Sequence, residues 1–397
     1  MINITIIGGG IVGCAIAYEL SHNKNFHITL IERSDIIPGI NQSSRNGGII
    51  HSSVYYPNDI EPLKAKLCLE GNERMYAFCK QYDLPHKNTG KLIVATDERE
   101  EEYIHFFYKT GIKNGVKGVK IITGAEAKVF EPNLENIRLA LHVPSAGSAA
   151  LIPLLSKIKE LGESNGVSFI LGTTVTGITR NGDSITIATN KKAVQTDMVI
   201  NAAGLYSDVI AKMINPELDY VIEPTRSELC QFDKSQREDI HMNGMHIYQT
   251  PYCYDTKTRE RVYPSAKDLP VLLHKGVIAK AAGVHLSPAF DFIDGKYIMK
   301  NTISIGPVKT LGLGKEDYTT NLKPAKTYIA DIPFFPHLKE QDLTPRYAGI
   351  MAINKGHDDF IIERDKKFPD CIQLVGMDSP AWTSSLAIAK YVSRLIA

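Results

Sequence analysis

Apolar and polar residues alternate along this chain in a way that predicts strands followed by helices. Residues 4–7 form a short apolar run of mainly β-branched residues, which predicts a buried parallel strand. A helical pattern follows as far as Leu20, and a second apolar run at 28–31 predicts a neighbouring strand. This strand–helix–strand order at the start of the chain indicates an α/β protein.

Three glycines separate the first predicted strand from the helix. Gly8, Gly10 and Gly13 have the spacing G-x-G-x-x-G. In such a turn the first glycine permits a tight bend, the second lets the backbone approach a pyrophosphate, and the third lets helix and strand pack closely. Glu32, at the end of the second strand, is placed to accept hydrogen bonds from ribose hydroxyls, which disfavours NADP. The sequence therefore predicts a dinucleotide site, with FAD and NAD both open at this point.

Along the rest of the chain the type of predicted element changes at two points, near residues 216 and 345. Up to residue 215 it predicts helices at 62–82, 97–114, 125–130, 147–162 and 206–213, and strands at 91–95, 168–171, 174–179, 184–189 and 197–201. Between 216 and 345, strand-like pieces (222–232, 276–286, 297–305) alternate with Tyr, Pro and Gly turns, which indicates a mixed or antiparallel sheet. Residues 233–275 have weak periodicity and receive no assignment. After 345 the α/β pattern returns, and Ser379 and Pro380 are expected to cap and begin the closing helix.

This order predicts two interleaved domains. We expect an α/β fold, α+β overall, with a discontinuous Rossmann-like FAD-binding domain and an inserted β-rich substrate domain. The first would comprise residues 1–85, 148–215 and 345–397, and the second 86–147 and 216–344. The interleaving favours an FAD enzyme, because the cofactor domain of an NAD dehydrogenase is usually one continuous block.

Composition narrows the class of partner. The formal net charge is +1 with mixed signs throughout, so we expect no nucleic-acid surface. The six cysteines are scattered without metal-ligand spacing, which predicts reduced thiols and no metal site. The first strand begins at the start of the chain and no apolar run has the length of a membrane span, so we expect no signal peptide and a cytoplasmic protein. Peripheral attachment to a membrane stays open.

Several segments resemble one known family. They are S-S-R-N-G-G-I-I-H-S-S-V-Y-Y-P, G-K-L-I-V-A, E-A-K-V-F-E-P-N-L, N-A-A-G-L-Y-S-D, G-V-H-L-S-P and S-P-A-W-T-S-S-L-A-I-A-K-Y-V. Together they resemble the L-2-hydroxyglutarate dehydrogenase/oxidase branch of the D-amino-acid-oxidase-type FAD oxidoreductases, and glycerol-3-phosphate dehydrogenases are similar but less close. The resemblance implies FAD and a small 2-hydroxy acid that gives a hydride to flavin N5. The electron acceptor, oxygen, a quinone or another protein, stays open.

The resemblance also implies a set of FAD-binding residues. The diphosphate and adenosine would lie on Gly8, Gly10, Ile11, Val12, Gly13, Glu32 and Arg33, and the adenine side on Ala203 and Gly204. The loop past the pyrophosphate and flavin would be Ser43, Ser44, Arg45, Asn46, Gly47 and Gly48. The start of the closing helix would contribute Gly376, Ser379, Pro380 and Thr383. A helix N-terminus there stabilises the negative charge of reduced flavin.

Oxidation of a 2-hydroxy acid needs a base for the hydroxyl proton and a partner for the carboxylate. His51 and His285 are our candidates for the base, since imidazole titrates in the right range. The alternative for each is a hydrogen-bonded structural histidine. Tyr56 is expected to line the substrate pocket, although a tyrosine in a loop can simply pack.

The carboxylate partner departs from the family pattern. Relatives carry an arginine in a G-I-R segment, but here the third residue is Met351, whose thioether cannot pair with an anion. Arg346 or Lys355 would take over this role, or the substrate differs. The alternatives are therefore a glycerol-3-phosphate dehydrogenase, an amine or amino-acid oxidase, and a flavin-binding module without activity. An NAD enzyme would leave the second Gly-Gly loop unexplained.

Overall fold

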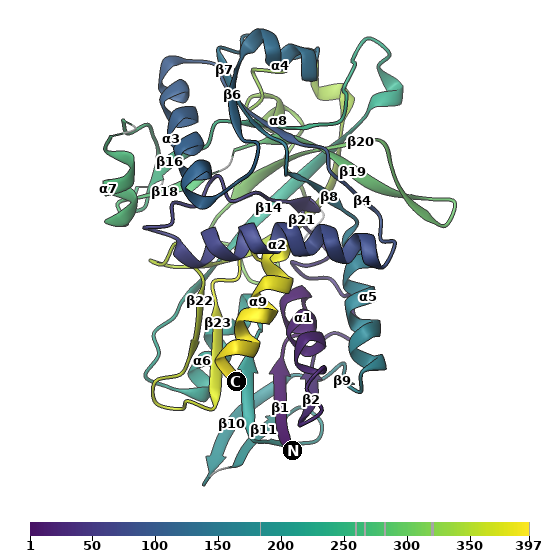
Figure 1. Ribbon diagram of the computed structural model, residues 1–397, viewed down its shortest axis with the longest axis vertical. Helices are drawn as coiled ribbons and strands as arrows, with labels where there is room; N and C mark the ends of the chain where they lie inside the picture. The colour runs from purple at the N-terminus through teal and green to yellow at the C-terminus, as the bar shows by residue number, and fades with distance from the viewer. Residues whose placement is uncertain (183, 259, 266, 282, 319–320, 397) are drawn as a thin grey trace.

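A six-stranded sheet forms the lower half of the molecule in Figure 1, a computed structural model that describes residues 1–396 apart from 183, 259, 266, 282 and 319–320. Its strands, in spatial order, are β22 (Ile361–Arg364), β23 (Cys371–Val375), β13 (Met198–Asn201), β1 (Ile2–Ile7), β2 (Phe26–Ile31) and β9 (Ser168–Ile170). All neighbours are parallel except β22 and β23. Three separate stretches of chain thus build one sheet, as the sequence predicted.

Helices cover this sheet and close it toward the upper half. α1 (Ile11–Leu20) packs against α5 (Leu151–Ser164) and α9 (Ala381–Ile396), and α9 packs against α2 (Pro62–Gln81). Apolar side chains from these helices and from β1, β2 and β23 form one buried core. In Figure 1 α2 lies across the junction between the two halves, so its residues can contribute to both.

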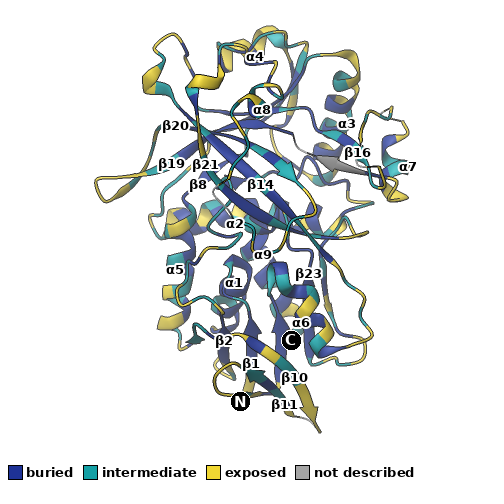
Figure 2. Cartoon of the chain, turned by 180° about the vertical axis from the view of Figure 1, so that it is seen from behind, coloured by how far each residue is buried: buried dark blue, intermediate teal, exposed yellow. Residues whose placement is uncertain are grey.

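A second sheet of eight strands forms the upper half. In order these are β21 (Leu343–Asn354), β14 (Ile222–Asp233), β20 (Lys296–Thr310), β19 (His285–Ile293), β15 (His246–Gln249), β5 (Lys91–Ala95), β7 (Leu139–Val143) and β6 (Lys120–Thr123). It is mixed, since β15 and β5 are parallel and their neighbours antiparallel. Much of β14 and β21 is buried where it faces the lower half (Figure 2). The domain boundary predicted at 345 falls inside β21.

The remaining elements are short or peripheral. The helices are α3 (Glu98–Asn114), α4 (Gly124–Phe130), α6 (Ser207–Ile214), α7 (Leu269–His274) and α8 (Lys326–Ile329). Three small sheets contain β3 (Ile49–Ile50), β8 (Gly147–Ala149) and β4 (His86–Lys87); β10 (Val175–Asn181), β11 (Ser184–Thr189) and β12 (Val194–Thr196); and β17 (Arg261–Val262), β16 (Tyr252–Asp255) and β18 (Ile278–Ala281). The 3₁₀ turns span Gly204–Tyr206, Lys234–Gln236 and Glu340–Asp342.

Two helix starts differ from the sequence prediction. Gly147 and Ser148 belong to β8, and α5 begins only at Leu151. The backbone at Gly147 is tightly enclosed, since a Cβ there would lie 2.2 Å from the Tyr76 hydroxyl oxygen. The closing helix begins at Ala381, so the expected cap and first residue both precede it. The segment 276–286 is likewise two strands, β18 and the start of β19, and α7 lies in the region left unassigned.

All six cysteines are buried and carry free thiols. In the part of the chain that the structure describes, no helix is both long enough and apolar enough to cross a membrane.

Candidate functional site

A cavity of about 720 Å³ lies between the two sheets. The lower half contributes the glycine turn after β1, the loop after β2 and the segment before α9. The upper half contributes residues of β14, β19, β20 and β21. This volume is typical of a site for a small molecule or cofactor.

The glycine turn leaves room for a ligand at one position and not at the others. A Cβ on Gly8 would lie 2.4 Å from the Ala202 carbonyl oxygen, and one on Gly13 would lie 1.9 Å from that of Gly8. Gly10 differs, because a Cβ there would meet only the Ser43 hydroxyl oxygen, at 3.1 Å, and Gly10 lines the cavity. Gly8 and Gly13 therefore serve the packing of the chain itself, whereas the space beside Gly10 suits a pyrophosphate.

Two side chains beside this turn are oriented by backbone groups. The N–H groups of Gly9 and Ser34 donate to the two carboxylate oxygens of Glu32, at 2.6 and 2.8 Å. The N–H of Ile11, at the start of α1, donates to the Ser43 hydroxyl oxygen at 2.8 Å, so the hydroxyl hydrogen of Ser43 can turn toward the cavity. An oriented acceptor and a donor at a helix N-terminus fit the ribose and phosphate groups of FAD.

A charged and aromatic cluster lies at the wall of the cavity. Arg33 forms an ion pair with Glu316, and its guanidinium carbon lies 4.4 Å from the centroid of the Tyr206 ring. Tyr206 also donates its hydroxyl hydrogen to Glu316. Ala203 and Gly204 line the cavity beside this cluster, so the predicted adenine side is bounded by Arg33.

The structure separates the predicted cofactor residues into those that line the cavity and those behind its wall. The lining ones are Gly8, Gly10, Ile11, Val12, Glu32, Arg33, Ser43, Arg45, Asn46, Gly47, Ala203, Gly204, Ser379 and Pro380. Gly13, Ser44, Gly48, Gly376 and Thr383 do not line it. Thr383 instead holds the loop, since its hydroxyl oxygen accepts from the His51 N–H at 3.0 Å and its hydroxyl hydrogen is donated to the Ile49 carbonyl oxygen at 3.1 Å.

His51, directly after β3, presents its ring to the cavity. Its backbone is held by Thr383 and by Asn72, whose amide donates to the His51 carbonyl at 2.8 Å. Nε2 lies 3.5 Å from the Ser379 hydroxyl oxygen, and buried Nδ1 has no hydrogen-bond partner among the described residues. Burial, followed by the charge of Lys91, lowers the pKa of His51 well below its ordinary value. The imidazole is therefore neutral near pH 7 and able to accept a proton.

His285, at the start of β19, forms part of the cavity wall. Its ring stacks on Tyr248 with centroids 3.9 Å apart and planes 7° from parallel, and Nδ1 lies 3.3 Å from the Gly283 carbonyl oxygen. Burial and then the charge of Lys91 lower the pKa of His285 as well. The other predicted pocket residue, Tyr56, also lines the cavity and hydrogen-bonds the Ser379 side chain. The fold thus brings both predicted histidines and Tyr56 to one cavity.

Two charged groups near the cavity, Lys91 and the Lys64–Asp378 ion pair, were not predicted from the sequence. Lys91 on β5 is fully buried, with its ammonium 4.0 Å from the ring centroid of Tyr248 and 5.1 Å from that of Tyr55. Lys64 on α2 forms a buried ion pair of 2.8 Å with Asp378, and both line the cavity. The sequence contains one indication of the buried lysine, because Lys91 begins the otherwise apolar run K-L-I-V-A.

The predicted anion partners do not lie together. Met351 and Lys355 line the cavity, and Lys355 is exposed at its edge. Arg346 does not line it; its guanidinium carbon lies 5.4 Å from the Tyr347 ring centroid. Met351 thus occupies the position at which an arginine was expected. Of the two residues suggested to replace that arginine, Lys355 lines the cavity and Arg346 does not.

Comparisons of this chain with a family model, with curated proteins and with solved structures all find FAD-dependent oxidoreductases or dehydrogenases. The model of a family described as FAD dependent oxidoreductase matches residues 3–395. An L-2-hydroxyglutarate dehydrogenase of Indibacter alkaliphilus is 31% identical over 97% of this chain and 96% of its own. A glycerol 3-phosphate dehydrogenase of Caloramator mitchellensis is 28% identical over 100% of this chain and 74% of its own. The solved L-α-glycerophosphate oxidase of Mycoplasma pneumoniae, with FAD bound, shares the fold with a TM-score of 0.79 and 24% identity, over 100% of this chain and 94% of its own.

Proposed function

Since the chain belongs to the family of FAD-dependent oxidoreductases, we propose that it oxidises a small 2-hydroxy acid, L-2-hydroxyglutarate being the leading candidate. The observation that supports this most directly is the position of His51. Its imidazole, neutral near pH 7, lines the cavity that the dinucleotide turn opens into, with Nε2 3.5 Å from the hydroxyl oxygen of Ser379. Glu32, Ser43 and the space at Gly10 would hold the FAD.

The chemistry divides between the cofactor and the chain. FAD, when bound, supplies the acceptor for the hydride that leaves the carbinol carbon. His51 accepts the hydroxyl proton as the hydroxyl becomes a carbonyl, so that a 2-hydroxy acid gives a 2-oxo acid. Ser379, hydrogen-bonded to Tyr56 and 3.5 Å from His51 Nε2, orients this imidazole. His285 and Tyr248, stacked on each other, form part of the cavity wall.

Two curated relatives favour different anionic alcohols as the substrate. An L-2-hydroxyglutarate dehydrogenase matches nearly the whole length of both chains, which favours a hydroxy acid over an amine. Glycerol 3-phosphate is the second candidate, because a glycerol 3-phosphate dehydrogenase matches this whole chain at lower identity. Both are anionic alcohols and would use the same base.

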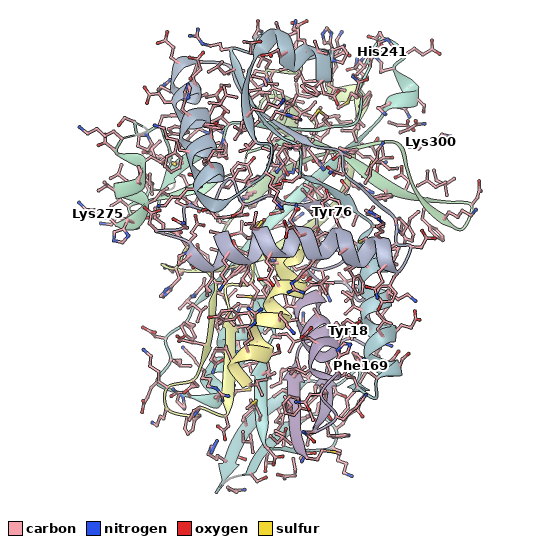
Figure 3. All side chains as sticks on the ribbon, viewed as in Figure 1. Tyr18, Tyr76, Phe169, His241, Lys275 and Lys300 are labelled. Atoms are coloured by element: carbon pink, nitrogen blue, oxygen red, sulfur yellow. The ribbon has the colours of Figure 1, made fainter. Side chains whose placement is uncertain are left out.

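A His51→Gln variant tests the proposed base. We expect it to keep bound FAD and a normal visible spectrum but to be reduced by L-2-hydroxyglutarate about 100-fold or more slowly under anaerobic rapid mixing. The matched control is His241→Gln, because His241 is exposed and projects from the far upper edge of the molecule (Figure 3). Equal reduction rates for His51→Gln and the wild type would exclude His51 as the base.

A further inference from the structure

Lys309 is a further cation on the cavity wall. It lies on β20, is partly buried, and lines the cavity. Its backbone carbonyl accepts from the Lys323 ammonium at 3.1 Å, but no acceptor among the described residues bonds to the ammonium of Lys309 itself. An ammonium on the cavity wall that bonds to no acceptor of the described chain can pair with an anion that enters the cavity.

Strand register places Lys309 on the same face of the sheet as Met351. Ser227 on β14 pairs with Lys309 on β20 and with Gly349 on β21, and directly opposed residues share a face. Met351 lies two residues beyond Gly349 and so points the same way. All four residues line the cavity. The sheet therefore presents a cation to the cavity from β20, while β21 presents a thioether.

Lys309 lies near a buried ion pair whose two members already have each other as partners. Lys309 lies within the electrostatic influence of Lys64 and Asp378. Lys64 and Asp378 satisfy each other in the 2.8 Å ion pair, and the nearby Glu61 carboxylate raises the pKa of both, so the four groups together carry no net formal charge. Burial lowers the pKa of Lys309 and exceeds the opposing attraction of Asp378, and the weaker repulsion from Lys64 acts in the same direction as burial. An anion bound beside Lys309 would oppose the effect of burial and raise this pKa.

The other cations on the cavity wall fit this role less well. Arg33 is paired with Glu316, and Lys64 with Asp378. Arg45 donates to the Ala348 carbonyl oxygen at 3.5 Å and lies over the Tyr318 ring. Lys257 and Lys355 are exposed, so their attraction for an anion is screened by water.

We infer that Lys309 is a substrate-binding residue that pairs with an acidic group of the substrate, a carboxylate or a phosphate. This inference rests on the proposed function, since it names a partner for the substrate of the same cavity. It also explains how a site with Met351 retains an anionic substrate. A primary ammonium accepts either anion as a point charge, so Lys309 sets the requirement for negative charge, while the shape of the cavity separates carboxylate from phosphate.

The test measures binding without turnover. We would titrate the oxidised holoenzyme with glutarate, a dicarboxylate that lacks the hydroxyl, and in a second arm with inorganic phosphate, following the visible flavin spectrum. One of the two anions should change the flavin spectrum of the wild type. We expect Lys309→Gln to bind that anion roughly 10- to 100-fold more weakly than the wild type does. Lys309→Arg should restore binding to within about threefold of wild type. FAD affinity, measured by titration of the apoprotein, should be the same in both variants.

Two lysine variants serve as comparisons. Lys300→Gln lies on the same strand but is exposed near the hairpin end (Figure 3), and it should bind the anion as the wild type does. Lys355→Gln tests the competing cation at the cavity edge. A loss in Lys355→Gln with none in Lys309→Gln would overturn the inference, as would a loss of FAD affinity in Lys309→Gln or a wild type that responds to neither anion.

The outcome also separates the inference from the proposed function. If glutarate binding depends on Lys309 but L-2-hydroxyglutarate does not reduce the flavin, the inference stands and the proposed function fails. If L-2-hydroxyglutarate reduces wild type and Lys309→Gln with the same KM, the proposed function stands and the inference fails. If only glutarate changes the flavin spectrum, the acidic group that pairs with Lys309 is a carboxylate. If only inorganic phosphate changes it, that group is a phosphate.

Discussion

Replacing Lys91 with methionine should make the protein more stable, by an amount that depends on pH. The side chain is fully buried, and its ammonium faces the rings of Tyr248 and Tyr55 with no hydrogen-bond acceptor among the described residues. Burial therefore lowers the pKa of Lys91 from 10.5 to about 7. Methionine has a similar shape and no charge to desolvate, so Lys91→Met removes this cost while keeping the packing.

The magnitude follows from the difference in pKa between the folded and unfolded chains. Below pH 7 the lysine of the wild type is charged in both states, and the folded state bears the whole cost, about 5 kcal/mol for a shift of about 3.5 pKa units. Between pH 7 and 10 the unfolded chain binds more protons than the folded one, so the stability of the wild type rises with pH. The advantage of Lys91→Met should therefore shrink by about 1.4 kcal/mol per pH unit above pH 7.

Urea unfolding followed by circular dichroism at pH 6, 7, 8 and 9 measures this difference. Lys300→Met is the matched control, because Lys300 is exposed and should give a difference near zero at every pH. A constant difference between Lys91→Met and wild type from pH 6 to 9 would refute the reasoning, since it would mean that Lys91 keeps its charge when folded.

Three further outcomes follow from contacts of the cavity. Lys91→Met should also move the acidic limb of the flavin reduction rate to higher pH, because the charge of Lys91 helps to lower the pKa of His51; an unmoved limb would argue against that coupling. Gly10→Val should lose stoichiometric FAD, measured by absorbance after gel filtration, while the apoprotein loses only about 1 kcal/mol of stability; retained FAD would contradict the pyrophosphate placement. Lys64→Met should cost about 3–5 kcal/mol in urea unfolding. That loss should be smaller at pH 5 than at pH 8, because burial already raises the pKa of Asp378, which can then take up a proton; equal losses at both pH values would contradict this.

The features predicted correctly from the sequence depend on local patterns. The G-x-G-x-x-G turn, the strands on either side of it and the acid Glu32 are read within 30 residues, and the α/β fold class and the family resemblance are confirmed. The two predicted histidines meet in one cavity, although their roles stay predictions. Local patterns suffice here because each strand and turn is specified by its own residues.

The features that the sequence could not predict depend on pairings between distant strands. Lys91 lies opposite His246 across β5 and β15, and its burial by Tyr248 follows from that register. Lys309 faces the cavity only because β20 pairs with β14 through a register shift between Glu228 and Cys230. A one-residue change of register turns a side chain to the other face, and no single segment reveals which face is chosen.

The most direct test of the account is the anaerobic visible spectrum of the purified protein during addition of L-2-hydroxyglutarate. The account predicts a flavin spectrum at the start and the loss of its bands on addition, with glycerol 3-phosphate and a panel of amino acids reacting more slowly or not at all. Flavin bands that persist at millimolar concentrations of L-2-hydroxyglutarate would contradict the proposed substrate. Bands lost only with glycerol 3-phosphate would instead identify the second candidate.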